Sequence, residues 1–347
     1  MKTLTVFLSA FLITYVSIPL LRKLAFRFEI LDFPGGRKIH KEVTPLLGGI
    51  GIYLGLIVGL LFNSIYIKNF LPILLGATII TFIGLVEDIK GLSAQLRLLL
   101  QLIACLVVIG SGISVSFLPN NIWGNMGEVI ITIFWLLGVT NAYNYLDGMD
   151  GLAAGSSAIN LFFFAGILYS TGQFQLGLIS VALMAACLGF LPYNIRKEKT
   201  FLGETGSTFL GFVLACIALQ GNWAEDNTVR LFIPVLILGV PIFDMIFTTI
   251  MRIKEEKIKT IIQWLRYGGK DHFHHYLVEI GLKPLGAVVF IYFITISLGI
   301  SAIMVSNDVA IEGLLTLSQA SIIFGVIATL IVIGKRRRSG WIKDKKT

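Results

Sequence analysis

The chain has 347 residues, of which 56% are apolar and only 14% are charged. Soluble domains carry about 25% charged residues, so this chain has too little polar surface to cover a water-soluble globule. The mean hydropathy of +0.85 reflects the same deficit. Composition therefore excludes a soluble enzyme, a disordered chain and a disulfide-rich secreted module, and it favours a polytopic membrane protein. The net charge of +8 would suggest nucleic acid in a soluble protein, whereas here the placement of the charges decides its meaning.

Long apolar runs predict membrane-spanning helices, each of which needs about 20 mostly apolar residues. Their continuity favours helices over a β-barrel, whose strands alternate in short segments. The first run has no clear small-residue cleavage site, so we predict an uncleaved span rather than a signal peptide. We expect an all-α polytopic bundle, a single integral membrane domain over 1–347. In chain order, about eleven spans are expected at 3–21, 46–62, 70–86, 95–112, 127–143, 152–170, 175–191, 206–221, 230–250, 285–305 and 315–334.

If the amino terminus lies outside and the spans alternate in direction, most lysine and arginine residues fall on one side of the membrane. Only Lys2, Lys68 and Arg230 of the 28 then fall outside, which leaves 28 − 3 = 25 inside. Because positive charge favours cytoplasmic loops, we place the amino terminus outside and the carboxyl terminus in the cytoplasm. The charge is thus an orientation signal, and we expect a membrane partner and no nucleic acid. The cytoplasmic segments are expected at about 22–45, 87–94, 144–151, 192–205 and 251–284, with a basic tail at 335–347.

Acidic residues gather at helix ends on this same inside face. Magnesium binds one or two carboxylates together with phosphate oxygens, and nearby Lys and Arg neutralise further phosphate charge. The pattern therefore predicts a magnesium site that handles a phosphorylated substrate. A coupled transporter would place its acids near the bilayer midplane, and only Asp244 fits that alternative. The acids at the helix ends are Glu87, Asp88, Asp147, Asp150 and Glu204.

Five local strings occur in order along the inside segments. They resemble the signatures of the polyprenyl-phosphate N-acetylhexosamine-1-phosphate transferases, glycosyltransferase family 4. Within that family the chain looks like the branch that makes lipid-linked GlcNAc phosphates, and less like the related phospho-MurNAc-pentapeptide translocase. The strings are Asp32-Phe-Pro-Gly-Gly-Arg37-Lys38-Ile-His40 with Thr44-Pro45-Leu-Leu-Gly48-Gly49, Asn141-Ala-Tyr-Asn144-Tyr-Leu-Asp147-Gly-Met-Asp150-Gly, Phe201-Leu-Gly203-Glu204-Thr-Gly206-Ser207, Val240-Pro241-Ile-Phe-Asp244, and His272-Phe-His274-His275.

The resemblance implies a Mg²⁺-dependent phosphoglycosyltransferase, with Mn²⁺ as an alternative metal. Such an enzyme transfers a HexNAc-1-phosphate, foremost GlcNAc-1-phosphate, from a UDP-sugar donor to a membrane polyprenyl phosphate such as undecaprenyl phosphate. UMP is released, and a lipid-linked cell-envelope polysaccharide is initiated. The resemblance also implies a multi-pass protein of the plasma membrane with its active site on the cytoplasmic face. A homodimer is an expectation from the family alone.

The resemblance assigns the catalytic and metal-binding roles to four residues. Asp88, with Glu87 beside it, would orient or deprotonate the lipid phosphate; the alternative is a helix-end acid that faces water. Glu204 and Asn144 would hold the magnesium ion. The alternative is that Glu204 and its hydroxyl neighbours only cap the helix that follows.

Substrate contacts are assigned in the same way. Asp147 and Asp150 would bind the uridine, with Phe201 stacking on it, unless the Asp-Gly-Met-Asp-Gly string forms only a turn. Lys38 and His40 would meet phosphate or lipid, although as isolated residues they also fit topology charges.

Three of the four histidines stand together, His272, His274 and His275, and the resemblance assigns them to the phosphate and sugar of the donor. A zinc site is disfavoured because no fourth ligand stands at a usual spacing. We expect Asp244 to hydrogen-bond inside the bundle, with Arg252 as a candidate partner.

Three positions depart from the pattern that the family usually shows. Glu87 and Glu204 stand where Asp is usual, and Gly269 stands where an Asp usually precedes the first histidine by three residues, with Asp271 adjacent instead. Each glutamate adds a methylene, and magnesium is strict about geometry. The alternatives are therefore a related transferase with a different UDP-sugar donor, or a catalytically weakened substrate-binding relative.

Overall fold

The computed structural model describes residues 1–34, 42–63, 70–196, 199–260, 263, 267, 269, 271–306 and 310–344. Among these residues the predicted all-helical class is confirmed. The described exceptions are two short antiparallel strands, β1 (Leu31–Asp32) and β2 (Thr44–Pro45), in which Leu31 pairs with Pro45. The chain divides into two compact units, Met1–Trp223 and Ala224–Thr347, within the range that the sequence suggested as one domain.

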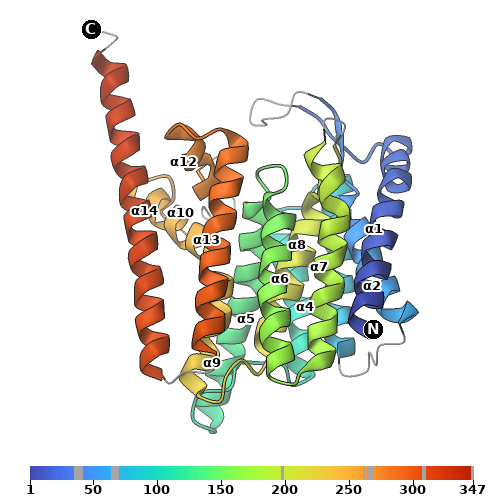
Figure 1. Cartoon of the computed structure of the whole chain (residues 1–347). Coiled ribbons are helices and arrows are strands. Elements are labelled where there is room, and N and C mark those ends of the chain that lie inside the picture. The colour runs from blue at the N-terminus through green and yellow to red at the C-terminus, as the bar shows by residue number, and fades with distance from the viewer. Residues whose placement is uncertain are drawn as a thin grey trace. The chain divides into compact units, whose positions relative to one another are not determined.

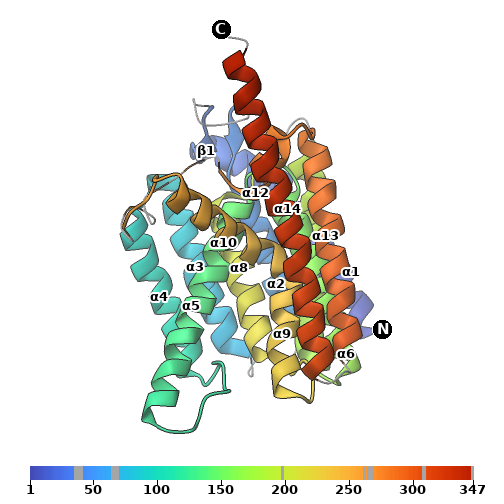
Figure 2. The ribbon, with the colours of Figure 1, turned by 90° about the vertical axis from the view of Figure 1, so that its left-hand side faces the viewer.

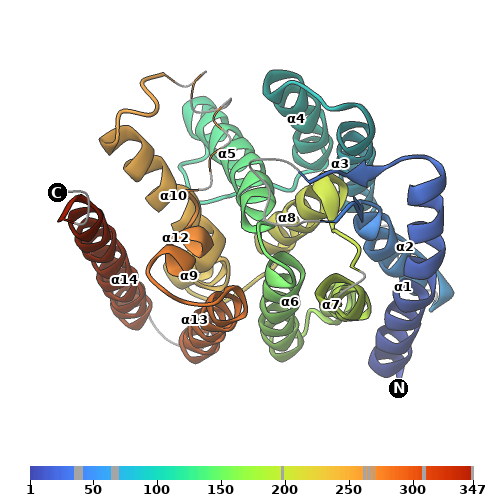
Figure 3. The same ribbon diagram turned by 90° about the horizontal axis from the view of Figure 1, so that it is seen from above.

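The first unit is a bundle of long helices (Figure 1). In it, α7 packs between α1 and α6, while α8 packs against α2, α3, α5 and α6. The view from above shows α8 enclosed by these neighbours (Figure 3). The helices of this unit are α1 (Lys2–Arg27), α2 (Gly48–Phe62), α3 (Leu71–Lys90), α4 (Ala94–Gly110), α5 (Ile122–Leu146), α6 (Leu152–Ser170), α7 (Phe174–Ile195) and α8 (Gly203–Gln220).

The second unit is built around two long helices that run side by side, α13 and α14 (Figure 2). The helix α9 packs against both, and α12 contacts α10, α13 and α14. Between α9 and α10 the axis bends by 77°. The helices of this unit are α9 (Asn227–Ile237), α10 (Gly239–Lys254), α12 (Phe273–Glu279), α13 (Pro284–Val305) and α14 (Ala310–Asp344).

Every predicted apolar span coincides with a helix or with the bent pair of helices. Seven described helices are long and apolar enough to cross a membrane, and the bent pair α9–α10 makes up to eight. The helices α2 and α4 are apolar but shorter. The chain is thus a multi-pass helical membrane protein, while the total of eleven spans and the sidedness of the termini remain predictions.

The outer faces of the helices suit lipid rather than water. On α1 the exposed residues Leu4, Leu8, Leu12 and Leu20 recur at helical spacing, whereas the opposite face is buried. A stripe of this kind would aggregate in water, because soluble proteins rarely expose large contiguous apolar patches. In a bilayer it is the expected surface.

Glycines allow α8 to lie close to its neighbours at the end where α8 begins. A Cβ at Gly49 of α2 would overlap the backbone of Gly206, and one at Gly84 of α3 would lie 2.5 Å from the Cα of Thr205. Helices in membranes approach most closely where small residues face each other. The start of α8 is therefore held tightly between α2 and α3.

This packing predicts that Gly49→Ala destabilises the first unit. The added methyl overlaps backbone, which cannot rotate away as a side chain can, and overpacking costs about 1–3 kcal/mol. The matched control is Gly110→Ala at the end of α4, where an added Cβ meets nothing within 4 Å. We expect a fall of several degrees in the Tm of the detergent-solubilised Gly49→Ala protein and no fall for the control. Equal Tm values for both variants would contradict the packing account.

Candidate active site

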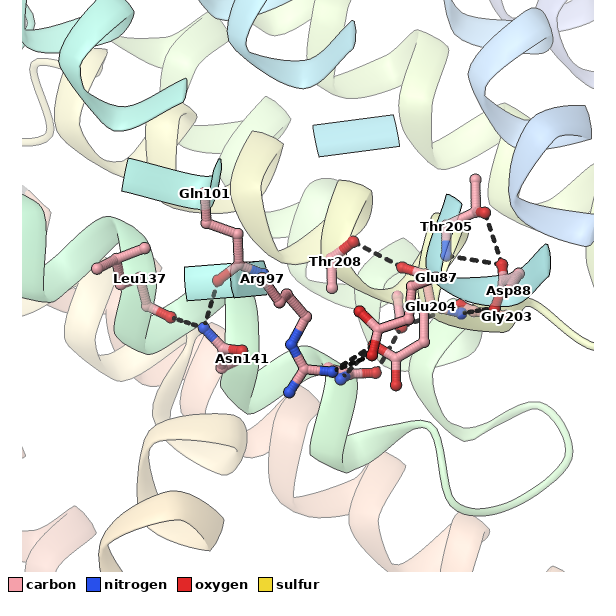
Figure 4. A network of polar contacts seen from close by, with 12 residues as sticks. Glu87, Asp88, Arg97, Gln101, Leu137, Asn141, Gly203, Glu204, Thr205 and Thr208 are labelled. Atoms are coloured by element: carbon pink, nitrogen blue, oxygen red, sulfur yellow. Dashed lines mark hydrogen bonds and ion pairs between the residues drawn. The ribbon is translucent and has the colours of Figure 1, made fainter. Parts of the chain in front are cut away.

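The start of α8 is anchored by a carboxylate from another helix. Asp88, in the last turn of α3, accepts three hydrogen bonds: from the Glu204 amide to Oδ1 (2.9 Å), and from the Thr205 amide (3.1 Å) and Thr205 Oγ1 (2.6 Å) to Oδ2 (Figure 4). The first amides of a helix lack partners within it, and a negative charge there is favoured by the helix dipole. Gly203 permits the approach, since its φ is +74° and a Cβ would lie 2.6 Å from Asp88 Oδ2.

Because Asp88 caps α8, the side chain of Glu204 is available for other partners. Its Oε2 atom accepts a hydrogen bond from Asn144 Nδ2 at 2.6 Å and lies 3.2 Å from Arg97 Nη1. The same Nη1 atom lies 2.7 Å from Glu87 Oε1 (Figure 4). The ends of α3 and α5 and the starts of α4 and α8 thus meet in one polar cluster. We call Glu87, Arg97, Asn144 and Glu204 the carboxylate cluster.

The geometry of the carboxylate cluster fits the binding of a divalent cation. It does not fit the alternative in which Glu204 only caps α8, because Asp88 supplies that cap. The Oε2 atom of Glu87 is buried and has no hydrogen-bond partner among the described residues, and an orphaned carboxylate oxygen is costly unless a cation or donor meets it. Ser207 Oγ donates to Asn144 Oδ1 at 2.9 Å and also lies 3.0 Å from the Gly203 carbonyl oxygen. If the Asn144 amide turned over, Ser207 could accept from Nδ2 while Oδ1 faced the cation.

No group of three described Asp, Glu, His or Cys side chains is arranged to hold a metal. Magnesium does not require one, because it commonly takes one or two carboxylates and completes its shell with water and substrate phosphate. Glu204 and Asn144, with Glu87 beside them, would fit a shell of that kind.

A second group of polar residues follows α5 at the same end of the first unit. Lys199 Nζ lies 2.7 Å from Asp150 Oδ2 and 5.3 Å from the centre of the Phe201 ring. Asn194 joins the two loops, since its Oδ1 accepts from the Gly151 amide at 2.5 Å and its Nδ2 donates to the Thr200 carbonyl at 3.0 Å. The Asp-Gly-Met-Asp-Gly string does form a turn, but the turn is fixed to the segment that carries Phe201.

Electrostatics link Asp147 to the carboxylate cluster. Burial, followed by the negative charges of Glu204, Asp88 and Asp150, raises the pKa of Asp147 to about 8. A carboxyl group held partly protonated near neutral pH is able to donate a hydrogen bond as well as accept one. A perturbed acid in a polar cluster is also a common mark of a functional site.

The histidines lie in the second unit and form a cluster of their own. His272 Nδ1 lies 3.0 Å from Asp244 Oδ2, and its Nε2 lies 3.2 Å from Arg252 Nη2. Arg252 forms a bidentate ion pair with Asp271, at 3.0 and 2.8 Å. Asp244 also accepts from the Phe273 amide at 2.6 Å. Asp244 thus hydrogen-bonds inside the bundle as expected, but it does so through His272, while Arg252 pairs with the Asp271 that departs from the family pattern.

The three histidines differ in their surroundings. Both ring nitrogens of His272 have partners within the second unit, which favours a role in holding the loop. His274 is fully buried, neither ring nitrogen has a hydrogen-bond partner among the described residues, and burial and His275 lower its pKa to about 3. His275 is partly exposed and contacts the His274 ring at 4.2 Å between centroids. Burial alone would raise the pKa of Asp271, but the hydrogen bonds and charge of Arg252 hold it below its usual range.

Comparison of the sequence with known proteins identifies the family of the chain. Residues 70–222 match the family model for glycosyl transferase family 4. The chain is 34% identical to a probable undecaprenyl-phosphate N-acetylglucosaminyl 1-phosphate transferase of Bacillus subtilis (strain 168), over 88% of this chain and 86% of that protein. The chain belongs to glycosyl transferase family 4.

Other similar proteins match over comparable lengths. The chain is 30% identical to a decaprenyl-phosphate N-acetylglucosaminephosphotransferase of Mycobacterium tuberculosis (strain ATCC 25618 / H37Rv), over 82% of this chain and 78% of that protein. It is 28% identical to an undecaprenyl-phosphate alpha-N-acetylglucosaminyl 1-phosphate transferase of Yersinia pestis, over 81% of this chain and 78% of that protein. These matches confirm the family that the five sequence strings indicated.

In this family 4 protein the structure brings the predicted residues Glu87, Asp88, Asn144 and Glu204 into one set of contacts. It brings Asp150 and Phe201 into a second group around Lys199. Two residues that the sequence did not single out, Arg97 and Lys199, contact the predicted acids. Their signal was present as basic residues close to acids on the inside face, but it was absorbed into the count of topology charges. The predicted contacts Lys38 and His40 lie outside the described residues. The predicted residues of the first unit that the structure does describe are Glu87, Asp88, Asn144, Asp147, Asp150, Phe201 and Glu204.

The raised pKa of Asp147 predicts a pH-dependent stability difference for Asp147→Asn. In the unfolded chain this carboxyl loses its proton near pH 4, whereas in the folded protein it keeps the proton up to about pH 8. The wild type is therefore destabilised progressively as the pH rises from about 4 to about 8, and asparagine removes this effect. We expect the Tm advantage of substrate-free Asp147→Asn to grow between pH 5 and pH 8 and to level off above that. Asp150→Asn, at a side chain that is 40% exposed, is the matched control. A Tm difference that does not vary with pH would contradict the pKa.

Proposed function

We propose that this family 4 protein is a Mg²⁺-dependent enzyme that transfers a HexNAc-1-phosphate from a UDP-sugar to a membrane polyprenyl phosphate and releases UMP. GlcNAc-1-phosphate is the group we favour, and the product initiates a lipid-linked cell-envelope polysaccharide. The observation that carries the proposal is the carboxylate cluster at the junction of α3, α4, α5 and α8. The names of the similar proteins from B. subtilis, M. tuberculosis and Y. pestis support the lipid acceptor and the sugar class.

The transfer reaction requires little covalent chemistry from the protein. An oxygen of the lipid phosphate attacks the phosphorus nearest the sugar, the bond from that phosphorus to the bridging oxygen of UMP breaks, and UMP leaves. Sugar, two phosphates and lipid remain joined in the product. Positioning and neutralisation of charge supply most of the catalysis in phosphoryl transfer. Carboxylates that hold a cation, with basic groups beside them, meet those needs.

We assign Glu204 and Asn144 to the cation and Glu87 to the lipid phosphate. Bound magnesium would neutralise charge on the transferring diphosphate. Glu87 is adjacent to the proposed cation ligands and keeps one oxygen without a hydrogen-bond partner, so it suits orienting or deprotonating the acceptor. Asp88 was the candidate for that task on sequence grounds. Its three hydrogen bonds to α8 favour a positioning role instead, in which it fixes the backbone of Glu204.

The donor is proposed to contact the turn after α5. Asp147 and Asp150 lie where they can meet the uridine, and Phe201 offers a ring for stacking once Lys199 moves from its face. Lys199 then becomes available to the diphosphate. His274 and His275 remain proposed contacts of the phosphate and sugar, and Lys38 and His40 remain proposed contacts of phosphate or lipid. His272 is proposed to act mainly by holding this histidine loop.

The location follows from the membrane helices and the distribution of charge. We propose a multi-pass plasma-membrane protein whose active site faces the cytoplasm, since 25 of 28 basic residues fall on the side where the acids gather. A UDP-sugar is available on that side. A homodimer remains a proposal that rests on the family.

The direct test is turnover by the purified protein. Protein in detergent with undecaprenyl phosphate, Mg²⁺ and radiolabelled UDP-GlcNAc should form a labelled lipid product and UMP in equal amounts. We expect Glu204→Gln to lower turnover by about 100-fold or more, since even residues behind metal ligands are worth 10–100-fold. Glu225→Gln, at an exposed acid that follows the far end of α8 in the sequence, is the control and should match the wild type.

Two outcomes would contradict the proposal in different ways. No lipid-linked product with UDP-GlcNAc or any other UDP-HexNAc would favour the catalytically weakened, substrate-binding alternative. Product formation with unchanged Mg²⁺ dependence in both Glu204→Asp and Glu204→Gln would leave the transfer reaction in place but refute the assignment of the metal.

A further inference from the structure

Arg97 joins the two positions at which glutamate replaces the usual aspartate. It stands in the first turn of α4, after Gly91, which ends α3 with a φ of +70°, and after the cap in which Ser93 Oγ accepts from the Leu96 amide. The helix α4 packs against α3, so Arg97 reaches Glu87 ten residues earlier in the sequence. Its Nη1 atom serves both Glu87 and Glu204. The longer side chains at 87 and 204 therefore meet at a single guanidinium nitrogen.

The two contacts of Arg97 are unequal. The distance to Glu87 is 2.7 Å, typical of a charge-assisted hydrogen bond, whereas the distance to Glu204 is 3.2 Å. The Glu204 oxygen is shared with Asn144 Nδ2, which lies closer, at 2.6 Å. Arg97 Nε is buried without a hydrogen-bond partner among the described residues. The guanidinium is thus fixed by Glu87 and only loosely held by Glu204.

Resting on the proposed function, we propose that Arg97 is a positioning residue and the internal counter-ion of the carboxylate cluster, competing with the divalent cation for Glu204. Without the cation, the guanidinium neutralises Glu87 and Glu204 together. With the cation bound, the Glu204 oxygen would serve as its ligand, and Arg97 would stay on Glu87. The basic residue therefore keeps Glu87 in place while lowering the affinity of the empty site for the cation.

A counter-ion role and a purely architectural role for Arg97 predict opposite changes in the affinity for the cation. Asp88, Asp147, Glu87 and Glu204 surround the site, and Arg97 is the basic residue in contact with the last two. Neutralising Arg97 removes both the competitor for the oxygen and the repulsion of the incoming cation, so the affinity for the cation should rise. A residue that only supports the architecture would do the opposite, because its loss would disorder the ligands and weaken binding.

Mn²⁺ is the probe, measured by electron paramagnetic resonance on the purified full-length protein without donor or lipid. We expect Arg97→Gln to lower the Kd for Mn²⁺ by about 10-fold, the scale of one unit charge at a few ångströms in a partly solvated site, while turnover falls. Arg97→Lys keeps the charge, so its Kd should stay within about 3-fold of the wild type. Lys90→Gln removes a charge from the exposed end of α3 and should leave both Kd and turnover unchanged.

Glu87→Gln provides a test that does not depend on the folding of Arg97→Gln. With Glu87 neutral, Arg97 has Glu204 as its remaining charged partner in the cluster, so Mn²⁺ should bind several-fold more weakly. Thermal unfolding of each variant shows whether the comparison is made on folded protein. An unchanged or raised Kd in folded Arg97→Gln, or an unchanged Kd in Glu87→Gln, would overturn the proposal.

The same titration separates this inference from the proposed function. If the wild type binds Mn²⁺ with the expected order of variants but makes no lipid product, the transferase proposal fails and the role of Arg97 stands. If the product forms while no variant binds Mn²⁺, the role of Arg97 is overturned and the transfer reaction stands.

Discussion

The carboxylate of Asp88 at the start of α8 is the interaction on which the candidate site depends. A helix begins with amides that have no partner in the helix, and inside a membrane protein such groups are expensive to leave bare. Here the partner is a side chain from α3, not a residue next to the helix. The single carboxylate of Asp88 therefore satisfies the first amides of α8 and also fixes the distance between α3 and α8. Gly203 and Gly84 make the approach sterically possible.

The other polar contacts extend from this junction. Since Asp88 supplies the cap, Glu204 turns toward Asn144 and Arg97, and Ser207 one turn later holds the Asn144 amide. Asn194 connects the turn after α5 to the segment that precedes α8. Each contact places an acid or amide that the proposed chemistry needs. In the second unit, Asp244 and Arg252 contact the two ring nitrogens of His272, and Asp271 forms an ion pair with Arg252.

Much of this was predictable from the sequence, and the reason is the membrane. A bilayer demands long apolar helices, so the fold class follows from composition. The rarity of acids made Glu87, Asp88 and Glu204 stand out, whereas Asn144 was indicated only by the family resemblance. The sequence could not show in which direction each acidic side chain points. Two adjacent acids at the end of a helix point to different sides, so Asp88 faces the backbone of α8 while Glu87 faces Arg97. Arg97 and Lys199 were missed because a basic residue on the inside face also satisfies the topology rule.

Asp88 acts either through α8 or directly on the substrate, and hydrogen exchange distinguishes the two. In Asp88→Ala we predict that exchange of the Glu204 and Thr205 amides, followed in the peptide spanning 200–208, speeds up by about 10-fold or more, since hydrogen bonds to a charged group contribute about 1.5–3 kcal/mol. The affinity for Mn²⁺ should fall with it. Unchanged exchange and unchanged Mn²⁺ affinity, together with lost turnover, would contradict the account and return Asp88 to the lipid phosphate.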